Sequence, residues 1–91
     1  MNPTALPAAN DALLKTILII DDDVHLAATY ALGLESHGYH ALCAANAAIG
    51  WDMAHAHLPD LILCDIEMPG KDGSRLLQDM RADAALADRP F

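Results

Sequence analysis

The chain has 91 residues, enough for one small domain and too few for two. Hydrophobic residues make up 54% of it and aromatic residues only 4%, so we expect an aliphatic core. Thirteen acidic and five basic side chains give a formal net charge of −8, whereas a surface that binds nucleic acid needs clustered basic residues. No apolar run approaches the roughly 20 residues of a membrane span, and no signal peptide is recognisable. We therefore expect a soluble, cytoplasmic domain that by itself binds neither nucleic acid nor membrane.

The first third of the chain contains one predicted strand and one predicted helix. Residues 1–15 show no period and are interpreted as a flexible N-terminal tail. A short aliphatic run over 16–21 is typical of a strand that is buried on both faces. From 24 to 37 the apolar spacing is helical, with Asp22 or Asp23 as the N-cap. On this helix, the residues expected to face the sheet are Leu26, Tyr30, Ala31 and Leu34.

The rest of the chain repeats this alternation of strand and helix. Strands are predicted over 39–45 and 61–65, and the first of these is less apolar, as expected at the edge of a sheet. Helices are predicted from the Asn46 cap to about Leu58, and over 73–82 after an Asp72 cap. The order β-α-β-α-β-α predicts an α/β fold with a parallel sheet. The two most apolar strands, the first and the third, should lie side by side.

Acidic residues follow both of these strands. Asp21 and Asp22 come at the end of the first strand, and Asp65 ends the third. Because parallel strands share one carboxyl edge, these side chains should converge there. Carboxylates close together destabilise a fold through repulsion, so such a group usually binds a cation, and oxygen ligands suit Mg²⁺ or Mn²⁺. A carboxylate beside such an ion can act as a nucleophile toward a phosphoryl group.

Two stretches resemble the receiver domain of bacterial two-component response regulators. They are Ile17-Leu-Ile-Ile-Asp-Asp-Asp23 and Pro59-Asp-Leu-Ile-Leu-Cys-Asp-Ile-Glu-Met-Pro-Gly-Lys-Asp-Gly73. The resemblance implies a flavodoxin-like fold with strand order 2-1-3 in the part present. It implies that Asp65 is the phosphoacceptor, and that Mg²⁺ (or Mn²⁺) is bound by Asp21, Asp22, Asp65 and the backbone carbonyl of Glu67.

The same resemblance implies partners for the domain. The phosphoryl donor would be a sensor histidine kinase, a phosphotransfer protein or a small molecule such as acetyl phosphate. The phosphorylated domain would then act on an output domain or form a homodimer. Such a domain signals and is not an enzyme in the ordinary sense.

The resemblance covers residues 16–91, where it stops before the family's fourth strand. The family's Ser/Thr after strand four and Lys after strand five, which contact the phosphoryl group, have no counterpart here. We interpret 16–91 as a partial receiver domain, truncated before strand four, from a longer chain. Its third strand should then be an edge strand with an uncovered face.

Two alternatives remain open from the residues. The chain could be a degenerate or truncated receiver that acts as a phosphorylation-independent interaction domain. It could instead be a Mg²⁺-dependent phosphatase with an aspartyl nucleophile. The phosphatase pattern would use Asp21-x-Asp23, but His25 departs from it and the run Met68-Pro-Gly70 is left unexplained.

Overall fold

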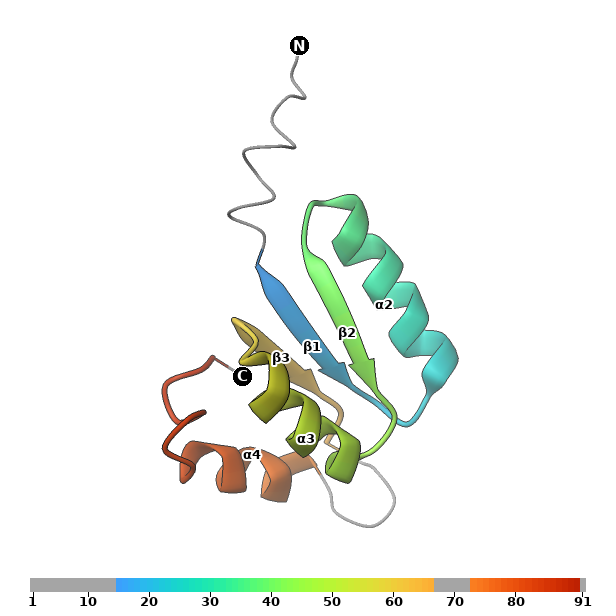
Figure 1. Ribbon diagram of the computed structural model, residues 1–91. Helices are drawn as coiled ribbons and strands as arrows, with labels where there is room; N and C mark the ends of the chain where they lie inside the picture. The colour runs from blue at the N-terminus through green and yellow to red at the C-terminus, as the bar shows by residue number, and fades with distance from the viewer. Residues whose placement is uncertain (1–14, 67–72, 91) are drawn as a thin grey trace.

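The structure is a computed structural model and describes residues 15–66 and 73–90. Its elements are, in order, β1 (Thr16–Ile20), α2 (Val24–Ser36), β2 (His40–Ala44), α3 (Ala47–His57), β3 (Leu61–Cys64) and α4 (Gly73–Arg81) (Figure 1). The strands form one parallel sheet in the order β2-β1-β3. The predicted alternation, the parallel pairing and the placement of the first strand beside the third are all confirmed. The fold is therefore α/β and flavodoxin-like.

Short-range signals in the sequence set where the helices begin. The Asp23 carboxylate accepts a hydrogen bond from the backbone N–H of Leu26 at 3.0 Å, which satisfies one of the unpaired donors of the first turn of α2. Asn46 caps α3 in the same way, accepting from the N–H of Ile49 at 2.8 Å. The N-cap of α2 is thus Asp23 and not Asp22. The predicted cap at Asp72 and the tail over 1–14 lie outside the described residues.

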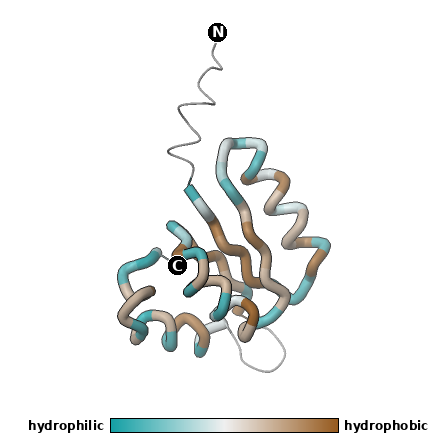
Figure 2. Tube along the Cα trace, in the orientation of Figure 1, coloured by the Kyte–Doolittle hydropathy of each residue, from teal (hydrophilic) through white to brown (hydrophobic). Residues whose placement is uncertain are grey.

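The sheet has a packed layer on each face, because successive side chains of β1 point to opposite sides. Leu18 and Ile20 join the larger cluster with α3 and α4, whereas Ile17 and Ile19 pack against α2. Figure 1 shows α3 and α4 on one side of the sheet and α2 on the other. In Figure 2 the most hydrophobic part of the trace lies along the strands. All four of these β1 side chains are buried, as predicted.

The face of α2 that meets the sheet differs from the predicted stripe. Ala27 is buried, with Ala31 and Leu34 partly buried behind it, but Leu26 is 41% exposed and Tyr30 is 50% exposed. The prediction was wrong for Leu26 and Tyr30 because it combined two adjacent rows of the helix into one stripe. The packing of α2 on β1 and β2 selects the row that contains Ala27.

The third strand has an open face, as expected. Leu63 is 40% exposed on the side of the sheet where α2 covers β1 and β2. The outer edge of β3 meets the end of the described chain, because the N–H of Ile62 donates to the carbonyl of Pro90 at 3.0 Å. Between α4 and Pro90 a series of turns places Leu86 in the core with no exposed surface. In the described part of the chain, no helix is long and apolar enough to cross a membrane.

Candidate functional site

Asp21 is held at the carboxyl end of β1 by two hydrogen bonds, one from its backbone and one to its side chain. Its N–H donates to the carbonyl of Ala44 on β2 at 3.0 Å, and its Oδ1 accepts from the N–H of Asp23 at 2.9 Å. The residue is only 9% exposed. A carboxylate that is buried and fixed in this way lies in a defined position and loses little entropy on binding a ligand.

Asp65 is fixed by the end of β3 and by the start of α4. Its N–H donates to the carbonyl of Ile20 at 2.9 Å, which continues the β1–β3 pairing one residue beyond Cys64. At the start of α4, the N–H of Gly73 donates to the carbonyl of Ile66, the residue after Asp65, at 2.7 Å. A Cβ atom on Gly73 would lie 2.8 Å from the carbonyl carbon of Asp65 and closer still to its oxygen. The first residue of α4 therefore packs directly on the backbone of Asp65, and glycine is required for that approach.

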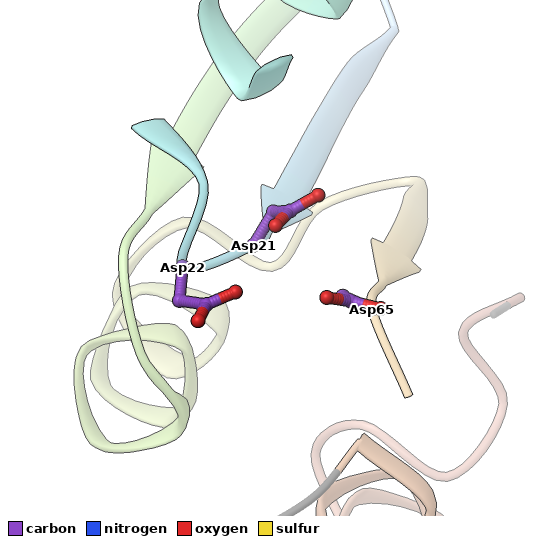
Figure 3. Close-up of side chains that lie close together, drawn as sticks. All are labelled: Asp21, Asp22 and Asp65. Carbon is purple, nitrogen blue, oxygen red and sulfur yellow. The ribbon is translucent and has the colours of Figure 1, made fainter. Parts of the chain in front are cut away.

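The structure brings the three predicted carboxylates together. Figure 3 shows Asp65, at the end of β3, facing Asp21 and Asp22, which follow β1. One carboxylate oxygen from each lies within 4.8 Å of the others. Their exposure is graded, with Asp21 buried, Asp65 intermediate and Asp22 exposed. Glu67, whose backbone carbonyl was predicted to complete the site, lies outside the described residues.

The electrostatic field at this end of β3 is negative. The pKa of the Cys64 thiol is raised to about 11, chiefly by burial and further by the charges of Asp65 and Asp21. Both causes disfavour the thiolate, so Cys64 is a poor nucleophile here. The same negative field attracts a cation to the carboxylates.

The donor set fits a hard divalent cation. It consists of carboxylate oxygens only, close enough to share one ion, with no imidazole or thiolate among the three ligand residues. Mg²⁺ and Mn²⁺ prefer such oxygens, and Mg²⁺ usually takes only one or two carboxylates and keeps water in its remaining positions. The exposed side of the site, at Asp22, leaves room for such water and for a ligand.

An apolar groove opens beside the carboxylates and was not predicted from the sequence. It has a volume of about 1260 Å³ and runs between α2 and the faces of β1 and β3. Leu26, Tyr30 and Leu63 line it, and the acidic residues lie along the same groove. The sequence feature that indicates this groove is that α2 has more apolar residues than one row of the helix can bury.

Comparisons with known proteins agree with this geometry. The model of the response regulator receiver domain family matches residues 17–88. Response regulator Rre1 of Synechocystis sp. is 37% identical over 76 residues, which are 82% of this chain and 33% of that protein. The N-terminal domain of a response regulator receiver protein from Methanoculleus marisnigri has a TM-score of 0.82 at 34% identity, covering 85% of this chain and 63% of that one.

A third relative was solved with ligands. Response regulator TrrA from Thermotoga maritima, in complex with Mg²⁺–BeF, has a TM-score of 0.73 at 29% identity, covering 76% of this chain and 60% of that one. This chain spans about a third of the length of the curated relatives it matches, and less than two thirds of these solved chains. With its family match, its parallel 2-1-3 sheet and its carboxylates at the shared strand edge, the chain belongs to the response regulator receiver domain family.

Proposed function

We propose that this domain accepts a phosphoryl group on Asp65 in a two-component signalling system. A divalent cation, Mg²⁺ or Mn²⁺, would be held by Asp21, Asp22, Asp65 and the backbone carbonyl of Glu67. The observation that carries the proposal is the convergence of three carboxylates within 4.8 Å at the sheet edge of a receiver-family domain. The Mg²⁺–BeF complex of the related TrrA supports the choice of cation. In this proposal residues 16–91 form the front part of a receiver domain, and residues 1–15 lie outside it.

The chemistry requires a fixed nucleophile with an open approach. One carboxylate oxygen of Asp65 forms a bond to phosphorus, while the bond from phosphorus to the donor breaks. That bond is P–N in a phosphohistidine and P–O in acetyl phosphate, and its electron pair leaves with the donor. A bound cation supplies charge neutralisation for the phosphoryl oxygens. The β1 pairing and the start of α4 hold the Asp65 backbone, so little orientation is left to lose when the donor arrives.

The proposed partners follow from this role. A sensor histidine kinase or a phosphotransfer protein would present its phosphohistidine at the exposed side of the site. The phosphorylated form would act on an output domain or on a second copy. These partners are proposed for the whole protein, because the part that is matched is only about a third of the length of the curated relatives.

The direct test exposes the chain to acetyl phosphate with and without Mg²⁺ and measures its intact mass. We expect a Mg²⁺-dependent gain of one phosphoryl group, which hydroxylamine then removes because the product is an acyl phosphate. A folded chain that binds Mg²⁺ but gains nothing would contradict the proposal and favour a phosphorylation-independent interaction domain. Steady turnover of a phosphomonoester would instead favour the phosphatase alternative.

Asp21→Asn should change metal affinity and stability in opposite directions. Asparagine keeps the Oδ1 that accepts from the N–H of Asp23 but removes one charge from the cluster. We expect Mg²⁺ binding, measured by isothermal titration, to weaken at least about tenfold. Without metal, urea unfolding should show a gain in stability on the order of 1 kcal/mol, because repulsion among the carboxylates is relieved.

Asp88→Asn is the matched control, since Asp88 is an exposed acid in the turns after α4. It should leave both measurements unchanged. If Asp21→Asn binds Mg²⁺ as tightly as the wild type, Asp21 is not a ligand and the metal assignment fails.

A further inference from the structure

His55 connects α3 to the segment that follows α4. Its Nδ1 lies 2.8 Å from the backbone carbonyl oxygen of Trp51, and its Nε2 lies 2.9 Å from Oδ2 of Asp83. A carbonyl and a carboxylate can only accept hydrogen bonds. Both bonds therefore require a hydrogen on both ring nitrogens, which is the imidazolium form. A neutral ring can make only one of the two.

Asp83 organises the turns over residues 82–90. Its Oδ1 accepts from the N–H of Ala85 at 2.9 Å, and its backbone carbonyl accepts from Leu86 and Ala87 at 3.1 and 2.9 Å. Leu86 is fully buried in the cluster shared with α3 and α4. This segment ends where the Pro90 carbonyl meets the outer edge of β3. The contact between His55 and Asp83 thus links α3 to the segment that borders β3.

We propose that protonation of His55 holds the 82–90 segment against α3. When the proton is lost, this segment and the edge of β3 that it borders open more readily. Closing takes one proton from solvent onto the neutral imidazole, and opening releases it. This pH-dependent contact between His55 and Asp83 lies apart from the carboxylate site and does not depend on phosphoryl transfer.

The environment of the pair agrees with a charged ring. The pKa of His55 is raised, first by the backbone carbonyl of Trp51 and then by Asp83, with a smaller contribution from Asp52, although burial acts in the opposite direction. The pKa of Asp83 is lowered, first by its hydrogen bond with His55 and then by the N–H of Ala85. The Trp51 ring also lies against the imidazole, with centroids 4.4 Å apart and the ring planes tilted by 53°.

The direction of the pH effect follows from these shifts. The raised pKa of His55 gives stability that is present below its ordinary value of 6.5 and is lost as the pH rises through the raised value. The lowered pKa of Asp83 gives stability that is present above 3.8 and is lost as the pH falls through the lowered value. The segment should therefore be held most firmly between these two limits.

Other titratable side chains lie on the elements that pack against α3. They are Asp52 and His57 of α3 itself, Arg75, Asp79 and Arg81 of α4, His40 and Cys43 of β2, and Asp88 and Arg89 of the 82–90 segment. Arg75 and Asp79 pair with each other at 3.3 Å, and the Cys43 thiol points to the carbonyl of Ala27, on the opposite face of the sheet. β1 has no titratable residue.

Amide hydrogen exchange and fluorescence test the proposal on the full chain. Trp51 is the single tryptophan, so quenching of its fluorescence by the imidazolium reports the protonation of His55. We expect the protection factors of the Leu86 and Ala87 amides to fall about two- to fivefold across this titration, the scale of a partly exposed ion pair. The fall should be centred on the His55 pKa and should shrink in high salt.

Asp83→Asn is the decisive variant. The asparagine side chain keeps an oxygen for the N–H of Ala85 and offers an N–H to a neutral Nε2, so the link survives without the proton. We expect the protection factors of this variant to be independent of pH in this range, with a lower pKa for His55. His57→Gln, which removes an exposed histidine from the same helix, should keep the wild-type dependence. If Asp83→Asn shows the wild-type dependence, or if His55 titrates with no change in protection, the proposal is overturned.

Discussion

Asp65→Asn will abolish the gain of a phosphoryl group from acetyl phosphate while leaving the chain folded. The amide of asparagine is not a nucleophile toward phosphorus, and the backbone bond from residue 65 to Ile20 does not depend on the side chain. The loss should be complete at every Mg²⁺ concentration, because no amount of cation restores the missing oxygen anion. Intact mass after a fixed exposure, beside circular dichroism of the same sample, measures both parts of this expectation.

The matched control for this variant is again Asp88→Asn, which removes the same charge from an exposed turn. It should gain the phosphoryl group at the wild-type rate. If the Asp65→Asn protein still gains a phosphoryl group, the acceptor is another residue. Peptide mapping would then show whether it is Asp21 or Asp22. Equal loss in both variants would mean that net charge, and not the nucleophile, controls the reaction.

Gly73→Ala should destabilise the fold by about 2–4 kcal/mol and slow phosphorylation at the same time. The added Cβ would lie 2.8 Å from the Asp65 carbonyl carbon and 2.8 Å from the Ile66 Cα. These are backbone atoms at the end of β3, so no side-chain rotation can relieve the overlap. Either α4 moves away from the sheet or Asp65 shifts from its place opposite Asp21. Urea unfolding and the rate of mass gain measure the two effects.

Two other glycines calibrate this prediction. A Cβ on Gly33, inside α2, would meet nothing within 4 Å, so Gly33→Ala should stabilise the protein by about 0.5–1 kcal/mol through helix propensity. A Cβ on Gly50 would lie 2.7 Å from Cδ1 and 2.9 Å from Cγ1 of the buried Ile20, so Gly50→Ala should also destabilise the protein. It should cost less than Gly73→Ala, because the overlap is with a side chain and not with backbone. If Gly73→Ala, Gly33→Ala and Gly50→Ala all change the free energy of unfolding by the same sign and size, α4 does not approach Asp65 closely and the prediction is wrong.

Local signals in the sequence were sufficient to predict the helices and strands, and to predict the edge of the sheet on which the carboxylates lie. Strand runs such as Leu61–Cys64 are bounded by Pro59 and Asp65, and the helix starts are marked by Asp23 and Asn46. Each of these signals acts within a few residues through a cap, a turn or a fixed dihedral. Parallel strands joined by helices then must share a carboxyl edge, which is why three acids far apart in the chain could be predicted to meet.

Packing alone decided which side of α2 is buried. Leu26, Tyr30, Ala27 and Leu34 are all apolar enough to face a core, and the period of the helix does not choose between adjacent rows. The position of α2 over β1 and β2 chooses the row of Ala27 and leaves Leu26 and Tyr30 on the groove beside the site. A sequence pattern describes an amphipathic helix but not the shape of the surface against which it docks.

Tertiary structure also decided the pairing of His55 with Asp83, which no pattern in the sequence indicated. The two residues are 28 positions apart, on either side of β3 in the chain. They meet because α3 and α4 cover the same face of the sheet and the turns after α4 fold back toward α3. The sequence by itself determined the elements and the acidic edge, because backbone hydrogen bonds and strand order act locally or by topology. Contacts between side chains of different elements depend on how those elements pack, and only the folded chain fixes that.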